Sequence, residues 1–378
     1  MKVLLDATMI PADLGGVGRY VDDLVPELVD VGVDLVMAVQ PRDAAHFAST
    51  VPAAEVVTVD RALRNRAVRM AWEQVGLPGL VDRVRPDVLH SPHYTFPERC
   101  HAARAVTLHD ATFFSNPEAH SLVKRQFFTR AISRAVRKAD ALVVPSLATR
   151  DETIHYVGGE VGRFHVAYHG VDREVFHPVD DEERARVAAS LGLGGKRYIG
   201  FLGTLEPRKN VPNLVRGWIE ACAGLEDPPA LVLAGGKGWD ENIDPAIAAV
   251  PDGLTLVRPG YLPLADLPGF LSGSEVLAYP SIGEGFGLPV LEAMSCGAAV
   301  LTTRLTALPE VGGDAVEYCG TDAHSIAKAL VTLLADPARR AALGRAAVAR
   351  AGLFTWRRSA LSHVEAYEYA LAHRRGAS

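Results

Sequence analysis

Short apolar runs alternate with amphipathic helical stretches along most of this chain, and this alternation limits the folds open to it more than any other feature. In the first part of the chain the apolar runs cover residues 2–5, 35–39, 56–59, 88–90, 105–108 and 141–144. Amphipathic stretches such as residues 19–31 and 122–139 lie between several of these runs. Buried strands that alternate with helices predict a mostly parallel, doubly wound sheet of the α/β class.

The same pattern starts again in the second part of the chain. After a polar stretch, further strand candidates cover residues 198–202, 230–233, 255–257, 276–279 and 299–302. The 378 residues also exceed the roughly 250–300 residues at which single cores stop growing. We therefore expect two α/β domains, residues 1–175 and 176–354, joined near the extended dipeptide His177-Pro178. The last helical pattern, within residues 355–378, should fold back onto the first domain.

Composition narrows the class of protein further. With 48% hydrophobic and 22% charged residues, the chain has the composition of a soluble globular protein. Its four cysteines are widely spaced and form no C-x-x-C pair, which indicates reduced thiols and a cytoplasmic location. Residues 1–10 are apolar but carry Asp6 and are too short for a signal peptide, and no run of about 18 apolar residues predicts a membrane span. A net charge of −6 gives no nucleic-acid signature.

Two glutamates, Glu284 and Glu292, flank a glycine-rich turn in residues 280–294, PSIGEGFGLPVLEAM. An apolar run precedes the turn, and Pro289 suits the first turn of a helix that Gly297 can end. Such a strand, turn and helix start presents backbone N–H groups and the positive end of a helix dipole to an anion, usually phosphate. Two carboxylates beside it suit a ligand that carries phosphate and hydroxyls, such as a nucleotide sugar. The alternative is a surface turn with two solvated glutamates.

Other polar residues follow the apolar runs directly, where an open α/β sheet binds its ligands. The segment GTLEPRKN, residues 203–210, places Arg208 and Lys209 in the first loop of the second domain. An arginine binds phosphate oxygens bidentately and a lysine adds a mobile charge, although a solvated basic turn would have the same sequence. His109 ends a strand of the first domain and is its best catalytic candidate, because an imidazole titrates near neutrality. A structural histidine is the alternative.

Three further patterns leave alternatives open. Gly16, Val17 and Gly18 open the first long helix and could approach a diphosphate, but they match a dinucleotide fingerprint poorly. His90 and His93 lack a carboxylate partner and helical spacing, so we expect no metal site. Two basic clusters could contact an anionic membrane surface or form ordinary solvated faces. Their members are Arg61, Arg64, Arg66 and Arg69, and Lys124, Arg125, Arg130, Arg134, Arg137 and Lys138.

Together these segments resemble the retaining nucleotide-sugar glycosyltransferases of family 4, also grouped as glycosyltransferase group 1. Glu284 and Glu292 resemble the E-x7-E motif of that family, and residues 280–310 resemble its donor-binding segment throughout. Asp6 with GGVGRY (15–20), LHSP (89–92), TLHD (107–110) and HGVD (169–172) are similar to other family segments. The resemblance covers nearly the whole chain. It implies the GT-B fold, in which two Rossmann-like domains face each other across an interdomain cleft and a C-terminal helix crosses back.

The resemblance also implies residue roles that the spacing does not show. Arg208 and Lys209 would neutralise the donor diphosphate, and Glu292 would hold the ribose hydroxyls. Glu284, together with backbone amides, would position the transferred sugar and phosphate, and His109 would face the reacting centre. The remaining donor-binding candidates are Gly16, Val17, Gly18, Thr204, Gly235, Lys237, Tyr261, Gly285, Phe286, Gly287 and Leu288. Thr204 is a departure from the family, because many members carry arginine there.

The implied activity is retaining transfer of a hexose from a nucleoside-diphosphate sugar to a hydroxyl of a glycan, a lipid-linked glycan or a small natural product. GDP-mannose is the first expected donor, and UDP- and dTDP-hexoses come next. The resemblance implies front-face attack without a metal or other cofactor, in a cytoplasmic protein that could contact the inner face of the membrane. Two alternatives stay open: a nucleotide-sugar epimerase on a similar fold and an inactive sugar-nucleotide-binding module.

Overall fold

The computed structural model describes residues 1–11 and 15–376, which form two compact units. The first unit contains the chain up to Gly170 and the residues from Thr355 onward, and the second unit is Val171–Phe354. The boundary therefore lies after Gly170 and not after residue 175. The reason is local: the Val171 amide donates to the Phe354 carbonyl at 3.2 Å, and the Ser295 hydroxyl donates to the Phe176 carbonyl at 2.6 Å.

The first unit is built on a seven-stranded sheet in the order β3-β2-β1-β4-β5-β6-β7, in which every pairing is parallel. Its strands are β1 (Lys2–Asp6), β2 (Asp34–Val39), β3 (Glu55–Thr58), β4 (Val88–Ser91), β5 (Ala103–Thr107), β6 (Ala141–Val144) and β7 (Phe164–Val166). Its helices are α1 (Gly15–Asp30), α2 (Ala44–Thr50), α3 (Arg66–Val84), α4 (Thr112–Ser115), α5 (Leu122–Lys138), α6 (Leu147–Val157) and α15 (Trp356–Gly376), with 3-10 turns η1 (Arg61–Arg64), η2 (Pro117–Ala119) and η3 (Val161–Arg163).

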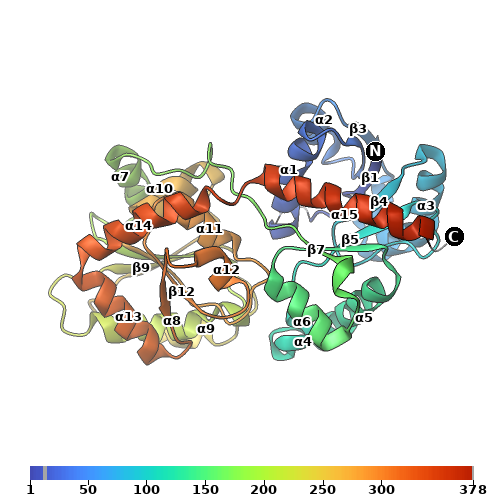
Figure 1. Ribbon diagram of the computed structural model, residues 1–378. Coiled ribbons are helices and arrows are strands. Elements are labelled where there is room, and N and C mark those ends of the chain that lie inside the picture. Colours follow the sequence, from blue (N-terminus) through green and yellow to red (C-terminus); the bar gives the residue numbers. More distant parts are fainter. Residues whose placement is uncertain (12–14, 377–378) are drawn as a thin grey trace. The chain divides into compact units, whose positions relative to one another are not determined.

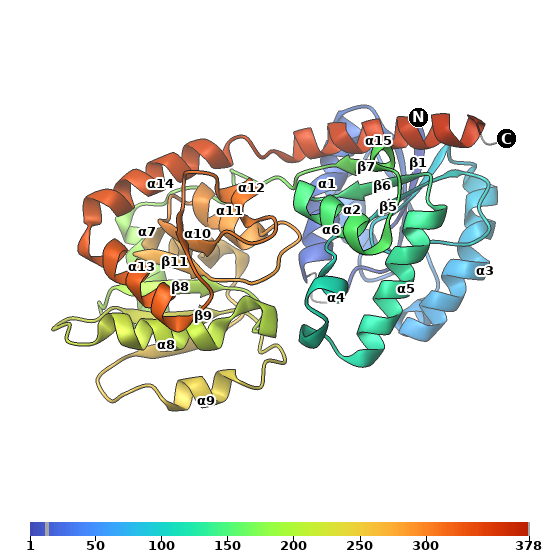
Figure 2. The same ribbon diagram turned by 60° about the horizontal axis from the view of Figure 1, so that its bottom comes forward.

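Helices cover both faces of this sheet, which explains why its central strands are apolar runs without alternation. On one face α3 packs through Leu77 and Leu80 against β1 and β4, and α5 packs through Ile132 against β5 and β6. On the other face α15 lies beside α1 and crosses β5, β6 and β7 (Figures 1 and 2). The C-terminal helix is thus an integral layer of the first unit.

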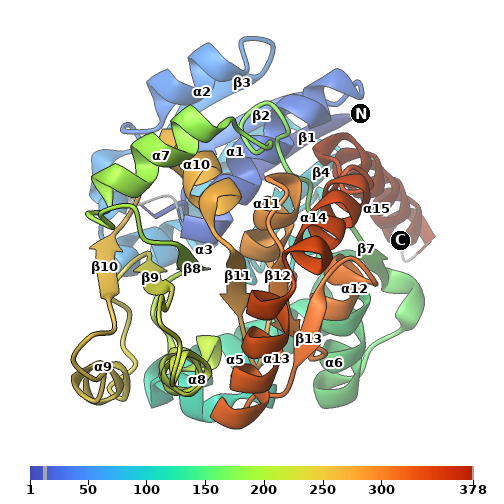
Figure 3. The same ribbon diagram turned by 90° about the vertical axis from the view of Figure 1, so that its left-hand side faces the viewer.

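The second unit has a six-stranded parallel sheet in the order β10-β9-β8-β11-β12-β13, which is seen across its width in Figure 3. Its strands are β8 (Tyr198–Leu202), β9 (Ala230–Ala234), β10 (Leu256–Gly260), β11 (Val276–Tyr279), β12 (Val300–Thr303) and β13 (Glu317–Cys319). Its helices are α7 (Asp181–Ser190), α8 (Val211–Cys222), α9 (Ile243–Ala248), α10 (Leu267–Gly273), α11 (Leu288–Ser295), α12 (Leu308–Gly312), α13 (Ala323–Ala335) and α14 (Pro337–Ala351), with 3-10 turns η4 (Pro207–Lys209) and η5 (Leu264–Asp266).

The helices of the second unit also form two layers. Helices α8, α9 and α13 pack together on one face of the sheet, and α7, α10, α11 and α14 pack together on the other (Figure 3). Trp218 of α8 is fully buried, and its indole N–H donates to the Pro229 carbonyl at 2.9 Å. The polar stretch at residues 180–186 is the start of α7, where the Asp180 side chain accepts the Glu183 amide and caps the helix.

Sequence patterning missed the edge strands β7 and β13. Each has three residues, and their residues are only partly buried except for Phe164. Strands this short carry too few residues to establish a period. No helix within the described residues combines the length and the apolar character needed to cross a bilayer.

Helix α15 docks onto the first sheet through a buried chain of hydrogen bonds. The His363 Nδ1 donates to the Ser359 carbonyl at 2.7 Å, so in the neutral ring Nε2 accepts from the Tyr20 hydroxyl at 2.6 Å. The Tyr20 oxygen then accepts from Thr107 at 3.1 Å, and the Thr107 oxygen accepts from His90 Nε2 at 2.8 Å. His90 Nδ1 accepts from Tyr367 of α15 at 2.8 Å, which closes the chain with both histidines neutral.

We expect the free energy of unfolding to decrease as the pH falls below about 6.5, the ordinary pKa of histidine in an unfolded chain. Burial lowers the pKa of His363 to about 4 and lowers the pKa of His90 well below its usual value. The unfolded chain therefore binds protons first, and His363 alone should cost on the order of 2 kcal/mol by pH 5. Urea unfolding between pH 8 and pH 5 measures how the free energy of unfolding changes with pH. His363→Asn should reduce the slope of that dependence, and an unchanged slope would contradict the assignment of the effect to His363.

Candidate active site

The loops that follow β8 and β9 meet at the carboxyl edge of the second sheet. The Gly203 amide donates to the Ala234 carbonyl at 2.9 Å, and the Gly235 amide donates to the Gly260 carbonyl at 2.8 Å. Gly235 has a φ of 128°, and a Cβ there would lie 2.2 Å from the Gly203 carbonyl oxygen. Only glycine allows this close approach. Thr204 follows Gly203 and is partly buried at the same edge.

A buried carboxylate, Glu284, lies at the centre of this edge and is only 6% exposed. Its Oε1 accepts hydrogen bonds from Lys209 at 2.5 Å, from the Tyr279 hydroxyl at 2.9 Å and from the Ser281 hydroxyl at 2.7 Å. Its Oε2 accepts from Arg208 at 2.6 Å. Four donors therefore fix one carboxylate, and the two predicted phosphate ligands contact the first glutamate of the predicted motif.

The backbone brings the two cations to this carboxylate. Pro207–Lys209 forms a 3-10 turn, and Asn210 follows in a left-handed conformation with a φ of 59°. The Asn210 side chain donates to the carbonyls of Pro280 and Thr321 at 3.2 Å and 2.7 Å. The Arg208 carbonyl in turn accepts the Ile282 amide at 2.8 Å. These bonds join the loop after β8 to the loop after β11, so the cations have a fixed place.

The charges at the site are nearly balanced. Arg208 also forms an ion pair with Glu206 at 2.8 Å, so two cations face two carboxylates. Burial alone would raise the pKa of Glu284, but Arg208 and Lys209 outweigh it and lower that pKa to about 2. Burial and the neighbouring Arg208 lower the pKa of Lys209, while Glu284 and Glu206 oppose that shift. Glu284 is therefore ionised at every physiological pH.

The glycine turn leads from Glu284 into α11 as the sequence indicates. Gly287, with a φ of 99°, is the residue before the helix, and Pro289 lies in its first turn. Phe286 is 4% exposed and packs edge-on against Phe354, with ring centroids 5.9 Å apart. Gly285 is buried and Leu288 is partly buried at the start of α11.

Glu292 lies within α11 and is 1% exposed, so neither motif glutamate is a solvated surface carboxylate. The Glu284 amide donates to the Thr306 hydroxyl at 2.9 Å, which fixes the backbone where the turn begins. Thr306 itself has a φ of 49°, an uncommon conformation for a β-branched residue.

Two of the predicted donor-binding residues, Lys237 and Tyr261, lie on the loops after β9 and β10. Lys237 is exposed, and Trp239 and Tyr261 are 46% and 68% exposed. A Cβ at Gly236 would lie 2.9 Å from the Tyr261 hydroxyl, so the Tyr261 side chain lies directly beside that glycine. An exposed aromatic ring beside a glycine loop offers a flat surface for a base.

In the first unit, the predicted residue His109 follows the carboxyl end of β5, and the other predicted residues lie at the start of α1. His109 Nε2 donates to the Pro92 carbonyl at 2.7 Å, which leaves Nδ1 as the acceptor of the neutral ring. Tyr20 packs edge-on against this ring at 5.1 Å between centroids. Burial lowers the pKa of His109. Gly16, Val17 and Gly18 belong to the first turn of α1.

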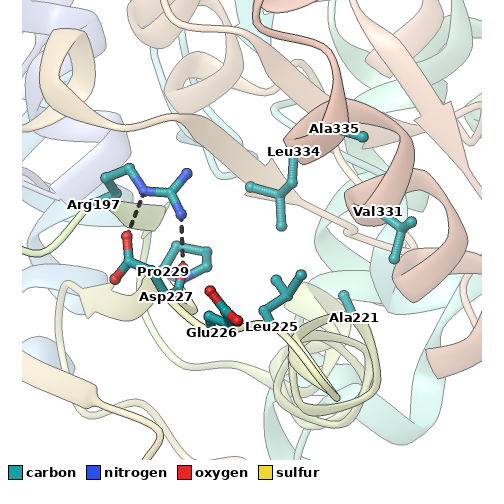
Figure 4. A pocket seen from close by; sticks show the side chains of 9 residues that line it. All are labelled: Arg197, Ala221, Leu225, Glu226, Asp227, Pro229, Val331, Leu334 and Ala335. Atoms are coloured by element: carbon teal, nitrogen blue, oxygen red, sulfur yellow. Dashed lines mark hydrogen bonds and ion pairs between the residues drawn. The ribbon is translucent and has the colours of Figure 1, made fainter.

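The second unit also has a surface depression, which is shown in Figure 4. It is lined by Arg197, Ala221, Leu225, Glu226, Asp227, Pro229, Val331, Leu334 and Ala335. Arg197 and Pro229 precede β8 and β9, so this depression is at the amino edge of the sheet. Its arginine is held by Asp227 and Glu275, each at 3.2 Å. Within the described residues, no three His, Cys, Asp or Glu side chains are grouped closely enough to hold a metal ion.

Comparison with known families shows which family of proteins this chain belongs to. The profile of the family "Glycosyl transferases group 1" matches residues 183–350, and that of "Glycosyltransferase Family 4" matches residues 14–175. The chain belongs to the group 1, family 4 glycosyltransferases. It is therefore a glycosyltransferase, and its first and second units correspond to the two family regions.

Full-length relatives of this glycosyltransferase agree with the assignment. It is 26% identical to O-antigen chain mannosyltransferase B of Escherichia coli, over 97% of this chain and all of the relative. It is 27% identical to α-maltose-1-phosphate synthase of Mycolicibacterium smegmatis, over 97% and 99% of the two chains. The crystal structure of HepE from Anabaena with UDP-glucose superposes with a TM-score of 0.73 at 18% identity, over 97% and 98% of the chains. The expected fold of two Rossmann-like domains is confirmed.

Sequence reasoning missed four residues that hold the site of this glycosyltransferase together. Glu206 pairs with Arg208, Tyr279 and Ser281 donate to Glu284, and Thr306 accepts from its backbone. In the sequence, Tyr279 is part of the apolar strand run 276–279. A hydropathy pattern registers its aromatic ring and gives no sign that its hydroxyl is a hydrogen-bond donor. Ser281 and Thr306 have no spacing signal, since their contacts depend on how three loops meet.

We expect Glu284→Gln to lower the free energy of unfolding by about 3–5 kcal/mol, because it leaves the buried Lys209 without the carboxylate that it contacts and leaves Arg208 with Glu206 alone. Guanidinium unfolding of purified protein at pH 7 measures the change. The matched control is Asp181→Asn, which breaks the exposed pair between Asp181 and Arg184 and should cost less than about 1 kcal/mol. Equal losses in the two variants would mean that the Glu284 cluster is no stronger than a surface ion pair.

Proposed function

We propose that this glycosyltransferase moves a hexose from a nucleoside-diphosphate sugar to an acceptor hydroxyl with retention at the anomeric carbon. The observation that carries the proposal is the pair of cations, Arg208 and Lys209, fixed to Glu284 at the carboxyl edge of the second sheet. A diphosphate leaving group develops negative charge as the glycosidic bond breaks. Cations that are already in place stabilise that charge without reorganisation in the transition state.

The remaining roles are those that the family resemblance implies. Glu292, on α11, would accept hydrogen bonds from the ribose hydroxyls, and Glu284 would position the transferred sugar. The amides at the start of α11 would bind phosphate oxygens, with Thr204 and Gly235 lining the diphosphate path. Lys237 and Tyr261 would contact the base. His109 remains the catalytic candidate of the first unit.

Front-face attack is the proposed reaction course, with the leaving phosphate accepting the proton of the acceptor hydroxyl. Glu284 fits poorly as a nucleophile because four hydrogen-bond donors occupy its two oxygens. A carboxylate whose pKa is lowered to about 2 is also a weak base at pH 7. Both observations favour a positioning role for Glu284.

Mannose is the proposed sugar and GDP-mannose the proposed donor. The support is the name of a relative that aligns along its whole length, the O-antigen chain mannosyltransferase B of Escherichia coli. A structural neighbour binds UDP-glucose, so UDP-glucose is the competing donor. The acceptor is proposed to be a hydroxyl of a glycan, either free or lipid-linked.

A thermal-shift comparison of GDP-mannose, UDP-glucose and dTDP-glucose tests the donor, because stabilisation grows with ligand concentration over its dissociation constant. We expect the largest rise in melting temperature with GDP-mannose. Proton NMR of the transferred sugar should then show retained anomeric configuration, with turnover unaffected by a chelator. A larger rise with UDP-glucose would overturn the donor, and an inverted product would overturn the stereochemistry.

Arg208→Gln should lower kcat/KM by about 100- to 1000-fold, the usual effect of removing one donor that meets developing charge. The matched control is Arg216→Gln on α8. Arg216 is exposed, and its guanidinium donates a hydrogen bond to the Asn213 side chain at 3.0 Å. Steady-state donor turnover measures both. If Arg208→Gln were as active as the control, the proposed role of Arg208 in stabilising the leaving diphosphate would be wrong.

Peripheral contact with an anionic membrane is proposed for the start of α5. Leu122 and Val123 are 72% and 79% exposed there, and Arg125 and Arg130 on the same helix are exposed. Apolar tips among basic residues favour an anionic bilayer surface. Flotation with phosphatidylglycerol vesicles should capture the protein at low salt, and Arg125→Glu with Arg130→Glu should release it. Equal capture by pure phosphatidylcholine vesicles, or no capture, would contradict the proposal.

A further inference from the structure

Tyr279 is the last residue of β11, and its ring is held rigidly inside the second unit. The residue is fully buried, and its ring stacks on Phe201 with centroids 5.8 Å apart and planes 16° apart. A tyrosine ring fixed in this way carries its hydroxyl to one place. That place is the centre of the cluster formed by Lys209, Glu284 and Ser281.

The Tyr279 hydroxyl links two charged groups whose hydrogen-bonding roles are fixed. A lysine ammonium can only donate and an ionised carboxylate can only accept. The hydroxyl accepts a hydrogen bond from Lys209 Nζ and donates its own hydrogen to Glu284 Oε1 at 2.9 Å. Lys209 Nζ also lies 4.8 Å from the centroid of the Tyr279 ring, close enough for a cation–π contact.

Because Lys209 is buried, its hydrogen bond to the Tyr279 hydroxyl helps to keep its amine protonated. Lys209 is 6% exposed, and the charged groups around it are Arg208, Glu284 and Glu206. Loss of an acceptor in such a place favours the neutral amine, because a buried ammonium needs its hydrogen bonds. The lysine ammonium is carried on a flexible four-carbon stem, so a fixed acceptor restricts where the ammonium can lie.

We propose that Tyr279 is a positioning residue for glycosyl transfer. Lys209 Nζ already contacts Glu284 Oε1 directly at 2.5 Å, and the Tyr279 hydroxyl gives the ammonium a second fixed acceptor that sets its orientation. This inference rests on the proposed function, in which Lys209 meets the charge of the departing diphosphate. Ser281 also donates to Glu284, so the hydroxyl of Tyr279 is needed chiefly for the ammonium.

Tyr279→Phe removes only the hydroxyl and keeps the stacked ring. We expect kcat to fall by about 10- to 100-fold, which corresponds to one lost hydrogen bond to a charged group. The donor KM should change less than kcat, because Arg208 still contacts Glu284. The alkaline limb of the pH–rate profile should move to lower pH by about one unit, since the amine then loses its proton more easily.

The matched control is Tyr198→Phe, in β8 of the same sheet. Tyr198 is 2% exposed, stacks on Phe270 at 5.7 Å, and donates its hydroxyl to the Phe270 carbonyl at 2.6 Å. Both variants lose one buried hydroxyl and should lose similar amounts of melting temperature. Only Tyr279→Phe should lower kcat and move the alkaline limb.

The outcomes separate this inference from the proposed function. If wild-type protein turns over a donor but Tyr279→Phe matches Tyr198→Phe in kcat and pH profile, the positioning role is wrong. If wild-type protein is stabilised by no nucleotide sugar and turns over none of them, the proposed function fails first. A loss of kcat in Tyr279→Phe without any change in the alkaline limb would also overturn the link to Lys209.

Discussion

The arrangement of the candidate active site in the second unit depends on one buried carboxylate. Glu284 receives four hydrogen bonds from two separate segments: the turn after β8, and the end of β11 with the loop that follows it. A buried ion with one partner removed destabilises a fold, whereas one with all its donors present is tolerated. The requirement to satisfy Glu284 therefore fixes the loops, and the loops fix the glycine turn and the start of α11.

In the proposed function, this arrangement would hold both cations in place before any donor binds. Free arginine and lysine side chains would lose conformational freedom on meeting a diphosphate. Here Arg208 and Lys209 are already held by carboxylates, so that entropy is lost on folding and not on binding. The two carboxylates, Glu206 and Glu284, also balance the charges of the buried Lys209 and the partly buried Arg208.

Much of this could be predicted from sequence because the fold depends on local patterns. Apolar runs without alternation predicted buried parallel strands, and the spacing of Glu284, Pro289 and Gly297 predicted a loop, a helix start and a helix end. The contacts of Lys209 with Tyr279 and Glu284 could not be predicted, because residues 70 and 75 positions apart meet only after the sheet has formed. Asn210 shows the same limit: its left-handed conformation and its bond to Thr321 depend on a partner far along the chain.

The Glu284 cluster of the second unit and the histidine chain of the first unit satisfy their buried polar groups in different ways, and the difference affects how each responds to acid. The second unit buries ionised groups, and a Glu284 pKa of about 2 means that its carboxylate stays charged until the pH falls far below the ordinary value. The first unit buries neutral histidines, whose hydrogen-bond chain from Tyr367 to Ser359 requires each ring to lack a second proton. Unfolded histidines bind protons from about pH 6.5 downward, whereas unfolded glutamates do so only near pH 4.3. Acid unfolding should therefore begin in the first unit, where α15 docks, while the cation pair of the second unit is still intact.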